Sequence, residues 1–287
     1  MIGRRACLLG AAAGLVTAPA RSAVDPLWRP RSLELREVAV EGSIGRRFVL
    51  GVPRGLDDPA ERLPLLVLLH GLAETTDERT GAWAWFERYG LGTAYDRLVD
   101  AGPFRGLVLA CPYLPNLPDA GAIDAYARFL TERVLPAARA RAPVYADPRA
   151  TYLGGCSLGG RLSLEVLLRR PAAFGAWGGV QAAIGVSQSA TYARRLHDLE
   201  REAGRGTPPI ALLVETSQGD PFRTANEALA HALTRSGVQN EFVELPGLHD
   251  QEWLRTAGTP TMLQWFDALR PPAPGRPDPL APPGPPP

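Results

Sequence analysis

The sequence predicts an α/β fold in which a mostly parallel sheet carries helices on both faces. Strand-like apolar runs alternate with helix-length segments from residue 33 to about residue 270. The run Leu65–Leu69 consists of five aliphatic residues, which is typical of a strand buried on both sides. The chain has 287 residues, of which 45% are hydrophobic, and is long enough for one domain with a substantial core.

The elements follow in order from local patterns. The runs 33–40 and 47–52 predict an antiparallel pair ahead of the buried strand 65–69. A helix over 158–170 is expected to end at Pro171, because proline cannot continue a helix. The other expected strands are 106–111, 150–155, 176–183, 210–215 and 241–245, and the other expected helices are 122–141, 190–203, 221–236 and 258–269.

The last connections of the predicted sheet are short. Only 24 residues run from Gly185 to Pro208, between the sixth and seventh expected strands. This length leaves room for one helix and not for a large cap domain, so a rather open site is expected.

The charged residues exclude several classes of function. All 31 basic side chains are arginines, so mechanisms that need a lysine amine, such as Schiff-base chemistry or a phosphate-binding P-loop, are excluded. A formal charge of +1 gives no reason to expect nucleic acid or an anionic membrane as a partner. The sequence has no clustered metal ligands and no G-x-G-x-x-G motif at a helix start, so no metal or nucleotide cofactor is expected.

Both ends of the chain differ from the region between them. Residues 1–20 contain Arg4-Arg5, a short apolar stretch and Ala18-Pro19-Ala20, which together predict an export signal. The paired arginines resemble a twin-arginine signal, a general secretory signal being the alternative, and the mature protein is expected to be periplasmic or extracellular. The apolar stretch is too short to span a membrane. Residues 271–287 include ten prolines and are expected to form an extended tail.

Removal of the export signal would leave two cysteines, Cys111 and Cys156. Both are expected at strand ends with a third strand between them, roughly 9 to 10 Å apart. This separation exceeds the limit of about 7 Å between the Cα atoms of a disulfide. Two buried free thiols are therefore expected.

The segment Gly155-Cys156-Ser157-Leu158-Gly159 matches G-x-S-x-G, in which a serine occupies a tight turn between a strand and a helix. Its context fits, because a strand is expected before the motif and a helix after it. Bulky side chains at 155, 159 and 160 would collide where strand and helix approach, and all three residues are glycines. Ser157 is therefore expected to be a nucleophile, with a helix N-cap as the structural alternative.

A serine nucleophile needs a histidine base, and the chain has four histidines. His197 and His231 fall inside expected helices. His70 precedes the serine, whereas the usual order on this kind of sheet is serine, acid, histidine, so His70 is interpreted as a structural hydrogen-bonder. His249 follows the last expected strand in the loop Pro246–Asp250 and is the expected base, with an ordinary surface histidine as the alternative.

The base needs a carboxylate to orient it. Asp220 follows the seventh expected strand and is the expected acid. Asp220 also precedes a proline, so a helix-capping role is a strong alternative, and Glu215 is the substitute acid if Asp220 only caps.

The remaining site residues carry weaker signals. Backbone N–H groups that stabilise an oxyanion are expected at Leu158 and at either Leu72 or Ala73. Gly71 is expected to let the chain turn after Leu69, so that one of the latter two N–H groups can face the oxyanion. An apolar substrate pocket is expected from the segments after the third and fourth strands, with helix packing as the alternative role for the tryptophans. The residues proposed to line it are Trp83, Trp85 and Tyr113.

Four segments together resemble one family. They are His70-Gly71, the turn at Ser157, the loop Gly219–Phe222 and the loop Pro246–Asp250. In type and order they are similar to motifs of the esterase D and feruloyl esterase branch of the α/β-hydrolases, a circle that includes secreted polyhydroxybutyrate depolymerase-like esterases. The resemblance covers about residues 33–270. It implies an α/β-hydrolase fold with eight central strands and hydrolysis of carboxylic esters through an acyl-serine.

The resemblance leaves the substrate and the acyl acceptor open. No carbohydrate-binding or substrate-anchoring module is visible, so the resemblance supports ester hydrolysis more strongly than it supports a polysaccharide or polyester target. The expected substrate is a small-molecule or polymer-borne ester, and the oligomeric state is undefined. Acyl transfer to an alcohol, as in secreted mycolyltransferases of related fold, is one alternative. A noncatalytic binding protein on a hydrolase scaffold is another, although binding alone has no need of a complete serine, histidine and acid set.

Overall fold

A computed structural model describes residues 29–42, 44–56, 60–204 and 209–271. The expected export signal over residues 1–20 lies outside the described residues, as does the proline-rich tail apart from Pro271. Within the described residues, no helix has the length and apolar character that crossing a bilayer requires.

The sheet has eight strands in the order β1-β2-β4-β3-β5-β6-β7-β8. β2 is antiparallel to β1 and to β4, and all other neighbouring pairs are parallel. The α/β class and the mostly parallel sheet of eight strands are therefore confirmed. The strands are β1 (Leu33–Ala39), β2 (Arg47–Pro53), β3 (Leu65–Leu69), β4 (Val108–Pro112), β5 (Thr151–Cys156), β6 (Ala176–Val180), β7 (Ala211–Gly219) and β8 (Glu241–Leu248).

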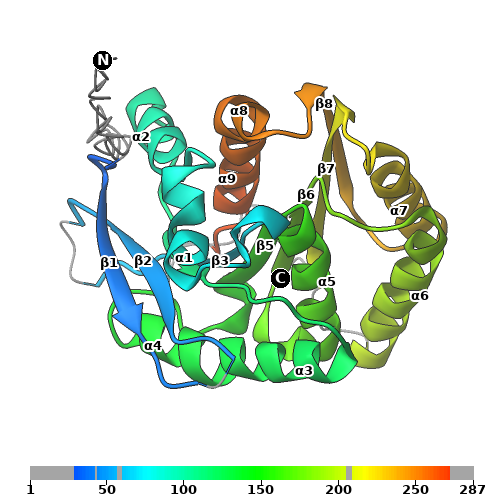
Figure 1. Cartoon of the computed structure of the whole chain (residues 1–287), viewed down its shortest axis with the longest axis horizontal. Coiled ribbons are helices and arrows are strands. Elements are labelled where there is room, and N and C mark those ends of the chain that lie inside the picture. The colour runs from blue at the N-terminus through cyan, green and yellow to red at the C-terminus, as the bar shows by residue number, and fades with distance from the viewer. Residues whose placement is uncertain (1–28, 43, 57–59, 205–208, 272–287) are drawn as a thin grey trace, which may run out of the picture.

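Helices cover both faces of this sheet (Figure 1). On one face lie α1 (Glu78–Glu87), α2 (Leu91–Ala101) and α9 (Thr259–Ala268), and on the other lie α3 (Ala120–Phe129), α5 (Leu158–Arg169), α6 (Val186–Ala203) and α7 (Arg223–Arg235). Two shorter helices are α4 (Leu135–Arg139), which continues α3 through a π-helical turn, and α8 (Gln251–Trp253).

The central strand β3 shows how the sequence produces two cores. Side chains alternate across a strand, so Leu65, Val67 and Leu69 enter one buried cluster while Leu66 and Leu68 enter the other. All five are fully buried. A strand with two buried faces needs an unbroken aliphatic run, which is the pattern that predicted it.

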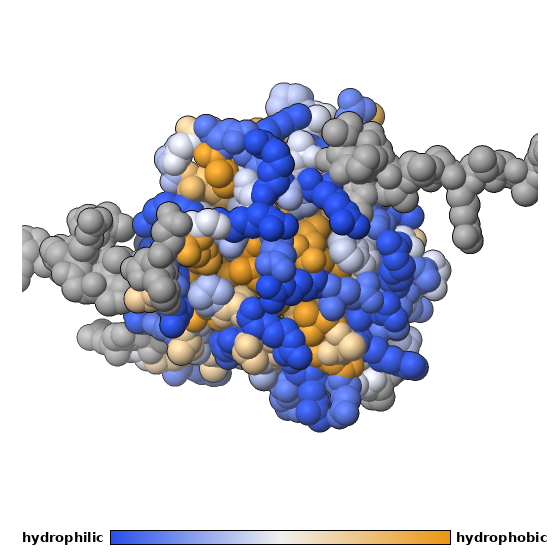
Figure 2. All heavy atoms as spheres, turned by 90° about the vertical axis from the view of Figure 1, so that its left-hand side faces the viewer, coloured by the Kyte–Doolittle hydropathy of each residue, from blue (hydrophilic) through white to orange (hydrophobic). Residues whose placement is uncertain are grey.

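The first edge of the sheet is protected by charge. β1 carries Glu34, Arg36 and Glu37 on exposed or half-exposed positions, and Arg36 and Arg47 form ion pairs with Glu34 and Glu37. Figure 2, which shows the side of the molecule seen at the left of Figure 1, has hydrophilic side chains crossing apolar patches. Charged residues on an edge strand discourage pairing with strands of other molecules.

Several boundaries differ from the expectation. α1 and α2 occupy a stretch for which no helix was predicted. Buried residues on several sides of α1 obscure a helical period, whereas the buried residues of α2 from Leu91 to Leu98 do have helical spacing. β6 ends at Val180 rather than residue 183, since Gln181 has φ +48°, outside the β region. β7 and β8 run three to four residues further than predicted, through a β-bulge between Ser217 and Gly219.

The expected free thiols and the absence of a large cap agree with the structure. Cys111 and Cys156 are buried and unpaired, and β3 separates the strands β4 and β5 that carry them. Of the elements that the structure describes between β6 and β7, α6 is the single helix.

Candidate active site

Three loops meet where the parallel strands β5, β7 and β8 end. Ser157 follows β5, Asp220 follows β7 and His249 follows β8. Because the carboxyl ends of parallel strands lie along one edge of a sheet, residues far apart in sequence come together there.

Ser157 occupies a strained turn between β5 and α5. Its backbone has φ +51°, which is unfavourable for a residue with a side chain. Its N–H donates to Val180 O at 2.9 Å, and its carbonyl accepts from Ala183 N at 2.9 Å. These bonds to the last residue of β6 and to the segment that follows β6 hold the turn in place.

The glycines around this turn are required by close backbone contacts. A Cβ atom on Gly159 would lie 2.2 Å from Leu69 O, and one on Gly155 would lie 2.6 Å from the backbone of Gly159. Any larger side chain at 155 or 159 would therefore collide with backbone atoms of the strand or the helix, as expected from the sequence.

His249 joins the other two loops. Its Nε2 lies 3.1 Å from Ser157 Oγ, and its Nδ1 lies 2.9 Å from Asp220 Oδ1. A carboxylate can only accept here, so Nδ1 carries the proton and Nε2 is free to accept from the serine hydroxyl. The ring is also packed edge-on against Phe222, with ring centroids 5.5 Å apart.

The Asp220 carboxylate is buried and fully hydrogen-bonded. Oδ2 accepts from Thr216 Oγ1 at 2.7 Å, and Oδ1 accepts from Phe222 N at 2.9 Å in addition to His249. Asp220 thus also closes the turn before α7, but α7 begins at Arg223, so Pro221 is not its first residue. The bonds to Thr216 and Phe222 set the direction in which Asp220 faces His249.

Glu215, the substitute acid, lies apart from the histidine. It is completely buried, and neither of its carboxylate oxygens has a hydrogen-bond partner. Burial raises the pKa of this carboxyl well above its usual range, which favours the neutral form. The carboxylate that the structure brings to His249 is that of Asp220.

His70 lies behind the loop that follows β3. Its Nε2 accepts from Leu114 N at 2.9 Å, so its proton is on Nδ1 and is donated to Gly71 O at 2.9 Å. Burial lowers the pKa of His70, which favours this neutral form. The side chain acts as a hydrogen-bonded link, as its interpretation from the sequence suggested.

The oxyanion candidates lie on both sides of the serine. Leu158 is the first residue of α5, and Leu72 and Ala73 open a 3-10 turn (Leu72–Glu74). Within the described residues, neither Leu72 N–H nor Ala73 N–H donates to another group. Both groups are therefore available to a substrate oxygen.

A cavity of about 340 Å³ opens beside these groups. Ser157 and His249 line it together with Leu72, Glu74, Tyr89 and Gln181. A larger cavity of about 720 Å³ lies at the amino ends of the parallel strands, against Tyr152 and Phe174, and touches none of the candidate catalytic residues. The smaller cavity is the one placed for chemistry at Ser157.

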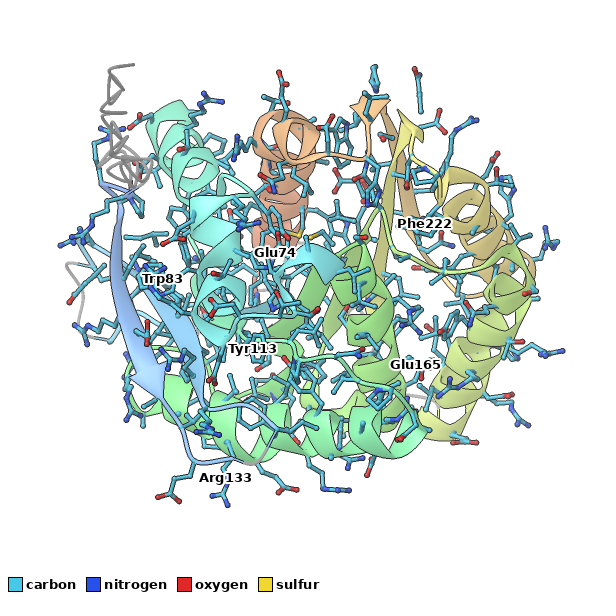
Figure 3. All side chains as sticks on the ribbon, viewed as in Figure 1. Glu74, Trp83, Tyr113, Arg133, Glu165 and Phe222 are labelled. Carbon is cyan, nitrogen blue, oxygen red and sulfur yellow. The ribbon has the colours of Figure 1, made fainter. Side chains whose placement is uncertain are left out.

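The three aromatic residues expected to line the pocket are not part of this lining. Trp83 lies beside β1 (Figure 3), where its Nε1 donates to Glu37 at 2.8 Å. Trp85 is fully buried in the core. Tyr113 stacks on His70 and donates its hydroxyl proton to Thr75 O. The helix α1 turns both tryptophans away from the site, and Tyr113 supports the loop from behind.

Two of the lining residues had no motif to mark them. Gln181 follows β6 at the same sheet edge as the other site residues, so its position after a strand was a usable signal. Glu74 is 2% exposed and contacts Tyr89 and Arg88, and no local pattern predicts such a contact.

Comparisons with known proteins place this chain among esterases. A family model described as "Esterase: Putative esterase" matches residues 42–256, which is 215 of the 287 residues. Among curated protein sequences, none matches the chain.

Solved structures are similar over most of the chain. A ferulic acid esterase has a TM-score of 0.67 and 19% identity, covering 83% of this chain and 98% of its own. A feruloyl esterase module from Clostridium thermocellum, complexed with sinapinate, has a TM-score of 0.65 and 16% identity, covering 86% of this chain and 91% of its own. The S-formylglutathione hydrolase FrmB from Staphylococcus aureus has a TM-score of 0.63 and 16% identity, covering 82% of this chain and 99% of its own. At these identities the similarity shows a shared fold.

Proposed function

This chain belongs to the esterase family and is a serine esterase of the carboxylesterase type, and from that premise we propose that Ser157, His249 and Asp220 are its catalytic triad. The observation that carries the proposal is the double contact of His249, 3.1 Å to Ser157 Oγ and 2.9 Å to Asp220 Oδ1. A noncatalytic protein would have no reason to keep a strained serine, a bridging histidine and a buried acid in this order.

The first half of the reaction forms an acyl-serine. Ser157 Oγ attacks the ester carbonyl carbon while His249 Nε2 takes the hydroxyl proton. The Asp220 carboxylate stabilises the imidazolium through the Nδ1–H bond. The tetrahedral oxyanion accepts hydrogen bonds from Leu158 N–H and from Leu72 or Ala73 N–H. Collapse of the intermediate breaks the ester bond, and His249 returns its proton to the leaving alcohol.

The second half repeats these steps with water. His249 removes a proton from a water molecule that attacks the acyl carbon, and Ser157 Oγ leaves and regains a proton. The free carboxylic acid and the original enzyme result. A cavity of about 340 Å³ beside Ser157 favours a small ester or the end of a polymer-borne one as substrate.

A fluorophosphonate probe tests the proposed nucleophile. The probe should label the wild-type protein on Ser157, as located by peptide mass spectrometry, and should fail to label Ser157→Ala. The same variant should lose about 10⁴- to 10⁶-fold in kcat on p-nitrophenyl esters with an unchanged circular dichroism spectrum. Labelling of another residue, or more than a tenth of the activity in Ser157→Ala, would contradict the triad. Added alcohols would show by product analysis whether acyl transfer competes with hydrolysis.

Export is a separate proposal that rests on the residues before position 21. Arg4-Arg5 and the apolar stretch after them support secretion to the periplasm or beyond. Fractionation of cells that express the whole chain would test it, with Arg4→Gln and Arg5→Gln combined in one variant. Retention of that variant in the cytoplasm is expected, whereas equal export of both forms would exclude a twin-arginine signal.

A further inference from the structure

The loop that supplies the oxyanion donors is tied to a buried tyrosine. Gly71 N–H donates to Tyr89 OH at 3.2 Å. Because an N–H group can only donate, the tyrosine oxygen is the acceptor, and its single proton is left for another partner. That partner is Glu74 Oε2. The chain of bonds therefore runs in one direction, from Gly71 through Tyr89 to Glu74.

Glu74 is suited to the end of this chain. Its carboxylate is almost completely buried, and its other oxygen accepts from Arg88 Nη1 at 3.2 Å, so the charge is paired. A carboxylate that draws the hydroxyl proton makes the tyrosine oxygen a better acceptor for Gly71 N–H. Burial, with smaller contributions from Cys156 and Glu74, raises the pKa of Tyr89 far above its usual range. The hydroxyl thus keeps its proton at any working pH.

The peptides that follow are held on their carbonyl side. His70 Nδ1–H donates to Gly71 O, and Thr75 Oγ1–H donates to Leu72 O at 2.9 Å. In a trans peptide the N–H points opposite to the C=O of the same unit, and the described chain has no cis peptide. Fixing these two carbonyls therefore fixes the directions of Leu72 N–H and Ala73 N–H.

The Tyr89 bond acts on the peptide before these two. It holds the His70–Gly71 unit, from which the loop leaves the end of β3, through the hydrogen bond that Gly71 N–H donates to the Tyr89 oxygen. The tyrosine oxygen also lies close against Gly71, since a Cβ on this residue would lie 3.1 Å from Tyr89 OH. Release of this peptide would let the loop shift as a unit relative to the end of β3, and the Leu72 and Ala73 N–H groups would then move relative to Ser157.

We propose that Tyr89, held by Glu74, is a positioning residue that orients the oxyanion-binding loop after β3. The proposal rests on the proposed function, because it matters only if an oxyanion forms at Ser157. Oxyanion donors stabilise the transition state only when their direction is set before the reaction, so loss of the tether lowers kcat and leaves KM nearly unchanged.

A matched pair of tyrosines tests this role. Tyr95 is buried like Tyr89, and its hydroxyl also accepts from a backbone N–H, that of Leu107, at 2.9 Å. Each of the two rings also packs edge-on against one aromatic neighbour. Tyr95 lies outside the lining of the cavity at Ser157. Tyr95→Phe therefore removes the same chemical group without touching the loop.

The measurement is kcat and KM on a p-nitrophenyl ester together with the melting temperature. Tyr89→Phe should lower kcat about 10- to 100-fold with KM changed by less than about 2-fold. Tyr95→Phe should lower the melting temperature by about as much as Tyr89→Phe does, and its kcat should stay within about 2-fold of the wild-type value. Equal kcat in the two variants would overturn the proposal, and so would a rise in KM alone, which would show that Tyr89 binds substrate.

Variants at Glu74 extend the test along the same chain of bonds. Glu74→Gln keeps an oxygen that accepts from Tyr89 and should retain most of the activity, whereas Glu74→Ala should lose about as much kcat as Tyr89→Phe. The double variant that combines Tyr89→Phe with Glu74→Ala should be no slower than Tyr89→Phe alone, because both changes break the same chain of hydrogen bonds to Gly71. Additive losses would show separate roles and overturn the proposal. Ser157→Ala separates the two hypotheses: if it remains active, the proposed function fails, whatever the tyrosine variants do.

Discussion

The side-chain amide of Gln181 donates from Nε2 to the carbonyl oxygen of Leu248 at 2.9 Å, one residue before His249. The same Nε2 donates to Ser217 Oγ at 2.7 Å, so one buried amide links the ends of β6, β7 and β8. The cost is a backbone φ of +48°, which a residue with a side chain adopts only when its surroundings hold it there. Strain of this kind beside a reacting group suggests that the bonds to Leu248 and Ser217 serve function.

Substitutions at Gln181 should separate stability from activity. Gln181→Ala keeps the unfavourable φ and loses both bonds, whereas Gln181→Gly loses the bonds but relieves the backbone. We expect Gln181→Gly to be more stable than Gln181→Ala by about 1 kcal/mol in urea unfolding. Both should lose about 10-fold in kcat, since His249 is less well placed. Full activity in the glycine variant would show that the amide does not position His249.

Asp220→Asn distinguishes a catalytic carboxylate from a turn-closing one. Asparagine can still accept from Phe222 N, so a purely structural Asp220 would tolerate the change. As the orienting acid it should not, because the amide favours the wrong histidine tautomer and carries no charge to stabilise the imidazolium. We expect kcat to fall about 10²- to 10⁴-fold with little change in melting temperature.

The control for this experiment is Glu215→Gln, which changes the other acid considered from the sequence. Its turnover should stay near that of the wild type, because Glu215 makes no hydrogen bond to His249. Normal turnover in Asp220→Asn combined with a collapse in Glu215→Gln would reverse the assignment.

Glu215→Gln should also change how stability depends on pH. Burial raises the pKa of the Glu215 carboxyl in the folded chain above its value of about 4.3 in the unfolded chain. Between these two values the folded state binds more protons, so this group makes the protein less stable as the pH rises through that window. The variant lacks this pH-dependent loss of stability. The melting temperature of the variant minus that of the wild type should therefore increase from pH 4.5 to pH 8. Glu132→Gln, which makes the same substitution at an exposed position, is the control.

Gly159→Ala should prevent correct folding. The new Cβ would lie 2.2 Å from Leu69 O and 2.5 Å from His70 O, which are backbone atoms that cannot move aside separately. We expect a loss above about 4 kcal/mol or insoluble protein. Gly121→Ala is the control, since Gly121 is an exposed helical glycine whose new Cβ would meet only Asp119 Oδ1 at 3.3 Å. This variant should gain about 0.5 to 1 kcal/mol, and a similar loss in both variants would contradict the steric argument.

The features predicted well from the sequence are those with a local cause. Aliphatic runs predict strands because two-sided burial demands them, as at Leu65–Leu69. Ser157 is marked by the glycines that its turn requires, and Asp220 and His249 are marked by their places after strands. The extension of β8 to Leu248 escaped prediction because Pro246 and Gly247 are typical of a loop, and only the bulge in β7 allows pairing to resume.

Features that depend on contacts between distant elements could not be predicted. Glu74 meets Tyr89 only because α1 folds back over the turn after β3, and the apolar aromatics near Trp83 suggested a pocket that α1 directs elsewhere. The nearest signal for Gln181 was its place after β6, but the positive φ that aims its side chain comes from the packing around it.

The position of β8 at the edge of the sheet gives the site a weak point. β8 is the strand that delivers His249, yet it has a neighbouring strand on one side only and is fastened otherwise by side chains, among them Trp265 Nε1 to Glu241 at 2.8 Å and Trp253 Nε1 to Pro246 O at 3.0 Å. Local opening of an edge strand requires less free energy than global unfolding. Heating should therefore detach the base from the nucleophile while the rest of the sheet is still intact, so that activity disappears at a lower temperature than the circular dichroism signal.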